Sequence, residues 1–455
     1  QLTKVNCYRN EKYNFYMNEL KSKYDVIVAG AGIAGISAAV KAAQLGASVL
    51  LIEHYGFVGG MSTAGMVSPF MKHKVNDEVL VRGVFEDIEN EMISRKGMID
   101  NGFYASSFRA SAFELLKNAN STILLNAQID EVIRTGNSIK SIKVIVNEEE
   151  LLIDADVFID TTGDAQLVYL GNFPWVKGDE KSGKLQALTL FFRMADIDVK
   201  AVAEYAKQHK EDFFDWMDYD FDFNKIISIA GFFSFVKRAV EQKKLPEEIQ
   251  YIFFTTLPDS GEGSFNTSNI LDIDGSTSEG LTKAELVGRN QVHQIVKLLQ
   301  DEIPGFEKAI LLETAVQVGV RETRRAIGDY IVTGDDIKFA HKFDDAIARG
   351  CYGIDIHGQK DEQSRMEHLP EGDYYEIPIR ALIVRDADNL LVAGRCISST
   401  REGHSALRIQ PTSAATGEAC GTLAALAVKH KMQIRDVNFR DVQKLIKHNL
   451  SQKSL

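Results

Sequence analysis

Cysteine is scarce in this sequence and never occurs as a close pair. The 455 residues contain four cysteines, and none of them stands in a CxxC or CxxxxC arrangement. Iron–sulfur clusters, zinc ribbons and redox-active dithiols use such closely spaced cysteines, so the spacing argues against all three. The thiols are interpreted as buried or incidental residues. No spacing supports a metal site formed by Asp355, His357 and His404 either.

Long apolar runs, an excess of positive charge and low-complexity tracts are also missing. No apolar run reaches the ~18 to 20 residues that a membrane-spanning helix needs. The net charge of −12 argues against nucleic acid as the main partner, although a locally basic pocket still suits a small anionic substrate. With 45% hydrophobic and 25% charged residues, the composition is typical of a soluble globular protein. A cytoplasmic location is expected, and a removed signal peptide would be invisible in a chain that starts at Gln1.

A glycine-rich turn near the N-terminal end predicts a dinucleotide-binding βαβ unit. Residues 30–35 read Gly-Ala-Gly-Ile-Ala-Gly, directly after an apolar strand and at the start of a helix of small residues. This context distinguishes the pattern from a chance GxGxxG. Gly30 permits the tight turn, Gly32 lets the main chain approach a diphosphate, and Gly35 lets the helix pack close to the strand.

The rest of this unit adds a phosphate site and a ribose site. Ile33 and Ala34 open the helix, whose N-terminus offers unpaired N–H groups to the phosphates. Glu53 ends the second strand, where a carboxylate accepts both hydroxyls of an adenosine ribose. The same carboxylate would repel a 2′-phosphate, which disfavours an NADP-type ligand. Ile129 is expected to lie beside the nucleotide as well.

Four later stretches resemble the signatures of glutathione-reductase-type flavoproteins, in the order typical of that class. They read Gly59-Gly60-Met61-Ser62-Thr63, Asp160-Thr161-Thr162-Gly163-Asp164, Asn389-Leu390-Leu391-Val392-Ala393-Gly394-Arg395 and Arg408-Ile409-Gln410-Pro411-Thr412-Ser413-Ala414-Ala415-Thr416-Gly417. The resemblance implies non-covalent FAD. It also implies cofactor contacts from Gly59, Gly60, Met61, Ser62, Thr162, Gly163, Asp164, Gly394, Arg395, Thr412, Ser413 and Ala414. His54 is expected near the adenosine end and not as a covalent flavin linkage.

Three further stretches, at 319–325, 352–357 and 377–382, resemble the bacterial family called FAD-dependent oxidoreductase, whose distant relatives include fumarate reductase flavoproteins. The resemblance covers about residues 24–430 and implies a cofactor and a fold, without naming a substrate. One position departs from the class, since many members carry Asp where this chain has Arg395. Because arginine accepts no hydrogen bond, the sugar hydroxyl must find another acceptor, or Arg395 faces a phosphate.

The predicted fold class is α/β, a Rossmann-like FAD-binding domain of the glutathione-reductase type with an inserted α+β substrate domain. Residues 1–171 are predicted as the first part of the FAD-binding domain, with an N-terminal arm at 1–22. Residues 172–375 are predicted as the substrate or cap domain. Within this range, residues 310–335 are alternatively interpreted as a return to the FAD-binding domain. Residues 376–455 complete the FAD-binding domain. The polar loop 261–280 is interpreted either as a lid or as a long connection.

The candidate catalytic residues precede the closing helix. His404 is the first candidate for a general acid or base, because imidazole has an ordinary pKa of about 6.5. Its alternative is a structural histidine. Arg408 is the candidate for anchoring the flavin or an anionic substrate, and its alternative is a buried ion pair. Arg321 or Arg324 either binds a substrate carboxylate or belongs to a salt-bridged hinge. For His357, too, both a functional and a structural role remain possible interpretations.

Two kinds of function follow from these motifs. The first is an FAD-dependent oxidoreductase that transfers hydride between the flavin and a small organic substrate. The alternative is a non-catalytic electron carrier or redox sensor, which would not need a second domain of this size. The Gly59-Gly60 pair and the Gly394 stretch argue against an NAD-only dehydrogenase. No motif indicates the electron donor or acceptor, and a homo-oligomer is left open.

Overall fold

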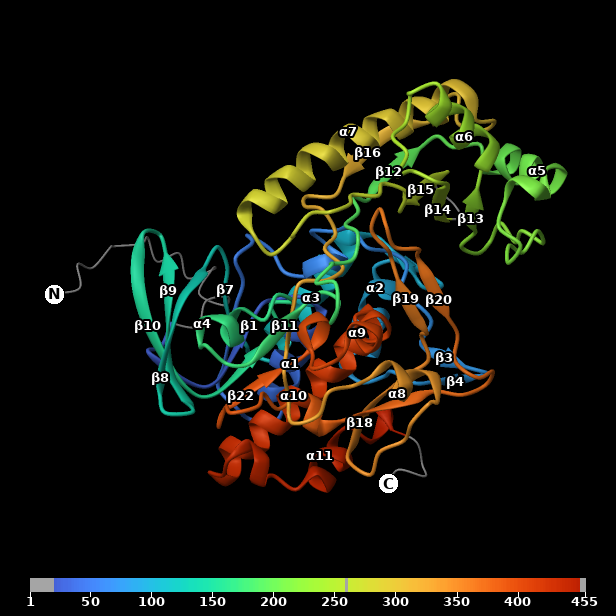
Figure 1. Cartoon of the computed structure of the whole chain (residues 1–455). Coiled ribbons are helices and arrows are strands. Elements are labelled where there is room, and N and C mark those ends of the chain that lie inside the picture. The colour runs from blue at the N-terminus through green and yellow to red at the C-terminus, as the bar shows by residue number, and fades with distance from the viewer. Residues whose placement is uncertain (1–19, 258–260, 451–455) are drawn as a thin grey trace.

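A sheet of seven strands forms the centre of the larger of two bodies in the molecule (Figure 1). The computed structural model describes residues 20–257 and 261–450, so most of the predicted arm at 1–22 lies outside the described residues. The strands that run parallel are β7 (Thr122–Leu124), β2 (Val49–Ile52), β1 (Lys23–Ala29), β10 (Glu149–Asp160) and β22 (Leu390–Val392). The antiparallel strands β9 (Ser138–Val146) and β8 (Gln128–Thr135) extend the sheet from the first half of β10. Because β22 pairs with β10, the two ends of the chain share one sheet, which confirms the predicted fold class.

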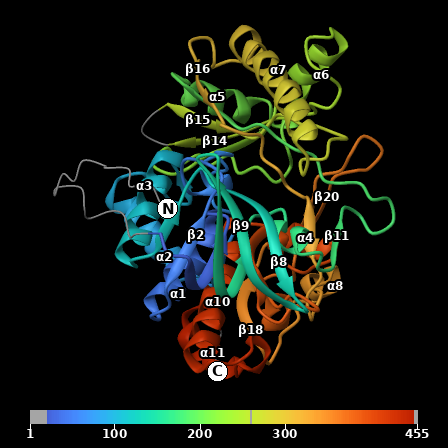
Figure 2. The same ribbon diagram turned by 90° about the vertical axis from the view of Figure 1, so that its left-hand side faces the viewer.

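The central strands are apolar because both faces of the sheet are covered. Val26 of β1 pairs with Val157 of β10 and Val49 of β2, and all three side chains are buried. On one face, α1 (Ile33–Gln44) lies against α10 (Gln410–His430), and Figure 2 shows the two helices near each other. A run of apolar residues without alternation is typical of such doubly covered strands.

Small residues let α1 and α10 approach closely. A Cβ atom on Gly417 would lie 2.1 Å from the carbonyl oxygen of Ala34, and one on Gly421 would lie 2.3 Å from that of Ala38. Helix α10 begins at Gln410, because Pro411 is well suited to a first helical turn. Its first turn therefore points at the end of the sheet where β1 meets α1.

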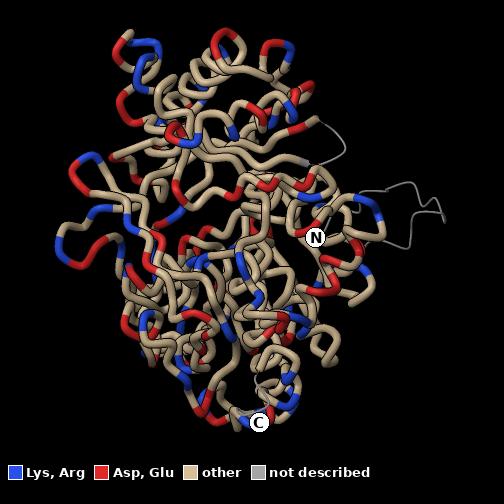
Figure 3. Tube along the Cα trace, turned by 90° about the vertical axis from the view of Figure 1, so that its right-hand side faces the viewer, with Lys and Arg blue, Asp and Glu red and all other residues tan. Residues whose placement is uncertain are grey.

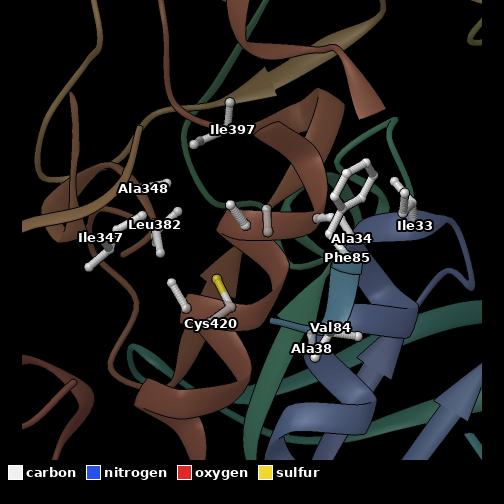
Figure 4. Packing of buried hydrophobic residues seen from close by; sticks show 14 of the residues in the cluster. Ile33, Ala34, Ala38, Val84, Phe85, Ile347, Ala348, Leu382, Ile397 and Cys420 are labelled. Atoms are coloured by element: carbon white, nitrogen blue, oxygen red, sulfur yellow. The ribbon is translucent and has the colours of Figure 1, made fainter. Parts of the chain in front are cut away.

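The opposite side of α10 packs against a segment that the sequence assigned to the substrate domain. Figure 4 shows Ile347, Ala348 and Leu382 near Cys420 of α10, in the same hydrophobic cluster as Ala38 of α1. The predicted boundary at 375 therefore differs from the packing. Side chains from Val332 onward already belong to the larger body, because β18 (Ala346–Gly350) and β21 (Tyr375–Pro378) lie beside this helix.

The smaller body has an antiparallel sheet and a hydrophobic core of its own. Its strands, in spatial order, are β13 (Ser228–Gly231), β14 (Ile252–Leu257), β15 (Glu262–Phe265), β12 (Phe192–Ala195) and β16 (Ile310–Thr314). Its helices are α5 (Val199–Gln208), α6 (Phe233–Glu241) and the long α7 (Ser278–Glu302). The core runs along the sequence from Leu188 to Val320, with Met66 added from the larger body. The predicted loop 261–280 contains β15 and the start of α7.

Shorter elements complete the two bodies. The helices are α2 (Val84–Ser94), α3 (Ala105–Asn118), α4 (Gln166–Leu170), α8 (Gly334–Lys338), α9 (Arg401–Leu407) and α11 (Phe439–Leu445). The strand pairs are β3 (Lys74–Val75) with β4 (Glu78–Val79), β5 (Met98–Ile99) with β6 (Gly102–Phe103), β11 (Trp175–Lys177) with β17 (Arg324–Ala326), and β19 (Ile354–Ile356) with β20 (Arg365–Glu367). Basic and acidic residues are interspersed along the chain in Figure 3. Across the described ranges, no helix combines the length and the apolar character needed to cross a membrane. Cys351, Cys396 and Cys420 are buried free thiols, and Cys7 lies outside the described residues.

Candidate cofactor and substrate site

A long cavity of about 380 Å³, here called the first cavity, opens at the carboxyl ends of β1, β2 and β10. Most of the predicted cofactor residues line it, namely Gly30, Gly32, Ile33, Ala34, Glu53, His54, Gly59, Gly60, Met61, Ser62, Ile129, Thr162, Gly163, Asp164, Gly394, Arg395 and Ser413. Gly35, Thr412 and Ala414 are not in its wall. They pack α1 and α10 against their surroundings instead.

The glycines of the first turn have three different physical roles. Gly30 has φ +92°, and a Cβ atom there would lie 2.7 Å from the carbonyl oxygen of Thr161. At Gly35 a Cβ atom would lie 1.9 Å from the carbonyl oxygen of Gly30. At Gly32 it would meet only the Cα of Gly60, at 3.9 Å. Gly30 and Gly35 are thus required by the protein, whereas Gly32 keeps the floor of the first cavity open.

Glu53 is held in the wall of the first cavity by two main-chain hydrogen bonds. The N–H of Ala31 donates to its Oε2 at 2.7 Å, and the N–H of Tyr55 donates to its Oε1 at 3.0 Å. The Nδ1 atom of His54 lies 2.8 Å from Oε1. The carboxylate is almost fully buried, so it is fixed where the predicted ribose hydroxyls would donate to it.

Arg395, the departure from the flavoprotein signature, has a carboxylate partner. Its Nη2 atom donates to Oδ1 of Asp164 at 2.8 Å, and the hydroxyl of Thr323 donates to the same oxygen at 2.7 Å. A Cβ atom on Gly163, which has φ +76°, would lie 2.7 Å from the Arg395 guanidinium. Asp164 thus places an acceptor in the cavity wall near the position where Arg395 replaces the usual aspartate.

Several residues of the first cavity were missed in the sequence, among them Tyr55, Ala127, Gln128, Thr161, Gln166, Gln317 and Gln410. Thr161 and Gln410 stand inside quoted motifs, so the motifs themselves would have indicated them. Gln317 comes from the smaller body, and the Tyr55 hydroxyl donates to its side-chain oxygen. The side chain of Gln410 connects α10 to the segment 62–67, because it accepts a hydrogen bond from the Ser62 hydroxyl at 2.6 Å and donates one to the Val67 carbonyl at 2.7 Å.

A second cavity of about 160 Å³ adjoins the first. The two cavities share Met61, Arg395, Arg408 and Gln410 in their walls. Its apolar wall comes from Val67, Pro69, Met71, Phe191, Phe253, Val320 and Ile409. Its polar wall includes Thr189, Asn266, Arg321, Tyr352, Asp355 and His357. The lining residues come from both bodies, so the second cavity lies where the bodies meet.

Asp355 is the centre of the polar wall. The Tyr352 hydroxyl donates to its Oδ2 at 2.9 Å, the Nη2 of Arg408 lies 3.3 Å from that oxygen, and the Nε2 of His357 lies 3.4 Å from Oδ1. Burial alone would raise the pKa of Asp355, but His357 and Arg408 hold it well below its usual range. Burial and the positive charge of Arg321 lower the pKa of His357. At neutral pH the aspartate is therefore charged and the imidazole is neutral.

Arg321 is the second cation of this cavity. It donates to the Ala187 carbonyl at 2.8 Å and to the side-chain oxygen of Asn266 at 3.4 Å. Burial and the neighbouring Arg408 lower the pKa of Arg321 to about 10, so it stays charged at neutral pH. Among residues 20–257 and 261–450, no carboxylate lies within ion-pair distance of its guanidinium.

The other members of the charged cluster have structural partners. Arg325 pairs with Glu322, which also lies 3.3 Å from Nε of Arg401, and all three side chains are buried. The Nε of Arg324 donates to the Asp164 carbonyl at 2.8 Å. Arg324 and Arg325 thus belong to structural contacts, and of this cluster only Arg321 lines the second cavity.

His404 differs from its prediction. It lies in α9, is fully buried, and lines neither the first nor the second cavity. Burial and the charge of Arg325 lower the pKa of His404 well below its ordinary value. Arg408, one helical turn later, has a side chain long enough to reach both cavities. The structure therefore brings Arg408, and not His404, to the site. No group of three or more metal-binding side chains occurs in the described part of the chain.

A family model described as FAD dependent oxidoreductase matches residues 25–446. The chain belongs to this family. Among solved structures, it is similar to a geranylgeranyl bacteriochlorophyll reductase-like protein from Thermoplasma acidophilum, with 14% identity, 95% of this chain and 85% of that chain covered, and a TM-score of 0.48. It is also similar to the flavin-dependent brominase Bmp2, with 10% identity, 95% and 85% coverage, and a TM-score of 0.48. A further similarity is to NikD, an amino acid oxidase of nikkomycin biosynthesis, with 11% identity, 89% and 94% coverage, and a TM-score of 0.47.

The first cavity fits the FAD that this family binds. The open floor at Gly32, next to the N-terminus of α1, suits a diphosphate. Glu53 suits the ribose hydroxyls, and the wall formed by Ala127, Gln128 and Ile129 suits the adenine end. The protein is an FAD-dependent oxidoreductase.

Proposed function

We propose that the protein transfers a hydride between FAD in the first cavity and a small organic substrate in the second cavity. The observation that carries this proposal is the shared wall of Met61, Arg395, Arg408 and Gln410, which makes the two cavities neighbours. Bound FAD supplies a group that accepts or gives a hydride. The residues of the chain hold the substrate, exclude water and move the accompanying proton.

His357 is the proposed proton acceptor. It lies in the wall of the second cavity and is neutral at neutral pH, as a base must be. When its Nε2 carries the hydrogen that faces Asp355, Nδ1 is left free to accept a proton from the substrate. Asp355 acts as a positioning residue, because it orients the imidazole while the Tyr352 hydroxyl and Arg408 stabilise its charge.

The first turn of α10 is the proposed electrostatic partner of the bound cofactor. Gln410 and Ser413 line the first cavity from this turn, where the N–H groups and the positive end of the helix dipole favour negative charge. Arg408 and Arg395 add positive charge to the same wall. These groups would stabilise the charge that develops on reduction.

The alternative, an electron carrier, does not need a substrate cavity of this kind. Anaerobic mixing of the FAD-loaded protein with a panel of small organic compounds separates the two. An enzyme is expected to lose its flavin absorbance with a small number of compounds, whereas a carrier would be reduced only by redox proteins or by a general chemical reductant.

A cavity-filling variant links that reaction to the second cavity. Val320→Trp adds a large ring to its wall and should lower the rate of flavin reduction at least 100-fold while FAD content is retained. Leu286→Trp, on the exposed face of α7, is the matched control and should react like the parent. An FAD-loaded Val320→Trp protein that reacts at the parental rate would refute this location.

A further inference from the structure

We infer that the second cavity takes a small monocarboxylate, whose negative charge lies against Arg321. This assignment rests on the proposed function, in that the second cavity is the place where the substrate binds. It follows from the balance of charge in the cavity, from the unused hydrogen-bond donors of Arg321 and Arg408, and from the apolar side chains in the cavity wall.

The charge balance leaves one cation uncompensated. Three arginines line the second cavity, namely Arg321, Arg395 and Arg408, and Asp355 is the only carboxylate among its lining residues in the described part of the chain. Arg395 is already paired with Asp164, which lies outside the wall of this cavity. Asp355 is already engaged by Arg408, by the Tyr352 hydroxyl and by the neighbouring His357. Because His357 is neutral and Arg395 is paired with Asp164, one positive charge, that of Arg321, is left uncompensated. A cation enclosed in a cavity without a carboxylate partner is unfavourable, so a bound anion would stabilise this arrangement.

The hydrogen-bond inventory indicates the same kind of ligand. A guanidinium has five N–H donors, and the bonds of Arg321 to Ala187 and Asn266 use only part of them. The Nε atom of Arg408 is buried without a hydrogen-bond partner among the described residues. A planar carboxylate matches the planar fork of such donors better than a spherical anion does.

The remaining walls set the size and polarity of the ligand. The cavity measures about 160 Å³, so only a small molecule fits. The apolar side chains in the cavity wall include Phe191, Phe253 and Met71, which favour an apolar body. A phosphate dianion would bring two negative charges to a wall with one uncompensated positive charge, and it would place its remaining oxygens against apolar side chains. A monocarboxylate with a short hydrocarbon chain satisfies both conditions.

Binding to the FAD-loaded protein tests this assignment without turnover. Butyrate, its neutral isostere butyramide, and inorganic phosphate are titrated separately, with calorimetry and the change in the flavin absorbance spectrum as readouts. We expect butyrate to bind at least 10-fold more tightly than either of the other two. Arg321→Met should weaken butyrate binding at least 10-fold and bring it close to butyramide. Arg321→Lys, which keeps the charge and loses the fork, should lie between the parent and Arg321→Met.

A matched control removes a positive charge elsewhere. Lys297→Met acts on the exposed face of α7 and should leave all three affinities unchanged. Equal binding of butyrate and butyramide, preferred binding of phosphate, or butyrate binding that survives Arg321→Met with FAD still bound would overturn the carboxylate assignment. These outcomes are separate from the proposed function, because a neutral compound that bleaches the flavin would support the oxidoreductase role while refuting the carboxylate.

Discussion

Gly32 shows how a single residue can matter for the ligand and not for the fold. Its missing side chain leaves space, since a Cβ atom would meet only the Cα of Gly60 at an ordinary contact distance. We therefore expect the free energy of unfolding of the FAD-free Gly32→Val protein to lie within about 1 kcal/mol of that of the parent. Its FAD content should fall at least 10-fold, because the valine methyl groups occupy the place of the diphosphate. Flavin released per mole of denatured protein measures this, and a fully loaded variant would refute the role of Gly32.

His357 predicts a pH dependence with a definite sign. Asp355, Arg321 and Arg408 face its imidazole, and burial together with Arg321 lowers its pKa. Substrate oxidation needs the neutral imidazole, so the rate should fall as the pH drops through a value below the ordinary pKa of histidine. Arg321→Met removes a cation, which raises the pKa of His357, so the acidic limb should move to higher pH. The rate of anaerobic flavin reduction at saturating substrate measures this shift.

The matched variant for that profile is His357→Gln, which should lose the acidic limb and reduce the rate at least 100-fold with FAD still bound. A limb that stays in place, or moves to lower pH, in Arg321→Met would contradict the role of His357 as the proton acceptor. Such a result would leave the FAD-binding assignment intact, because the first cavity does not include His357.

The residues of the first cavity were largely predictable, whereas in the second only single candidates such as Arg408 could be named, and not their arrangement. The cofactor residues occur in short motifs, in which main-chain geometry demands glycine at fixed spacings. Asp355 lies in β19 and His357 directly after it, whereas Arg321 comes from a distant segment, and their meeting depends on how the two bodies pack. His404 was predicted because it precedes the closing helix and an imidazole has an ordinary pKa of about 6.5, but its side chain is buried and only that of Arg408 reaches the cavities.

At the scale of elements, the contact of α1 with α10 connects the cofactor turn to the C-terminal part of the chain. A Cβ atom on Gly421 would lie 2.3 Å from the Ala38 carbonyl oxygen, so Gly421→Ala should push the helices apart. We expect the FAD-free protein to lose about 1–3 kcal/mol of unfolding free energy, even though alanine is the better helix former. Denaturant unfolding measures this loss.

The control for that prediction is the same substitution at Gly32, where the added Cβ atom meets nothing closer than 3.9 Å. When FAD is absent, the Gly32→Ala protein should have nearly the same free energy of unfolding as the parent. Equal stability of the Gly421→Ala protein and the parent would show that the two helices are not held at their close spacing by packing.

The central strands and helices could be predicted because their patterns are local. Strands β1 and β10 each have an apolar run near their end, which stops shortly before a glycine of a cofactor motif. The run is apolar because both faces of these strands are covered. The elements of the smaller body were harder to predict. The apolar stretch from Leu188 to Met194 forms a strand only from Phe192, where β12 begins, and Leu188 and Thr189 make isolated bridges. Such bridges depend on distant partners, which sequence periodicity does not show.

At the scale of the whole molecule, a change in composition indicated the inserted domain but not the point where the chain returns. Residues from Val332 onward belong to the same hydrophobic cluster as α10, so the return lies within the range 310–335 that was left open for it and well before residue 375. The segment after Val332 contains many charged and polar residues, so its composition does not differ clearly from that of the inserted domain. Only three-dimensional packing assigns the apolar residues of this segment to the larger core.

The first cavity also predicts how FAD affects the stability of the whole molecule. Its wall combines the ends of β1, β2 and β10 with Gln317 of the smaller body and with the first turn of α10. FAD should therefore bind the folded chain and not the unfolded one, and at 100 times its Kd it should stabilise the protein by about 2.7 kcal/mol. The Tm of FAD-free protein should rise by several degrees on adding FAD, with AMP giving a smaller rise because it occupies only the adenosine end. The control is Gly32→Val, which should remove most of the rise in Tm with either ligand. A Tm that does not change with FAD concentration would mean that these distant segments do not form one binding site.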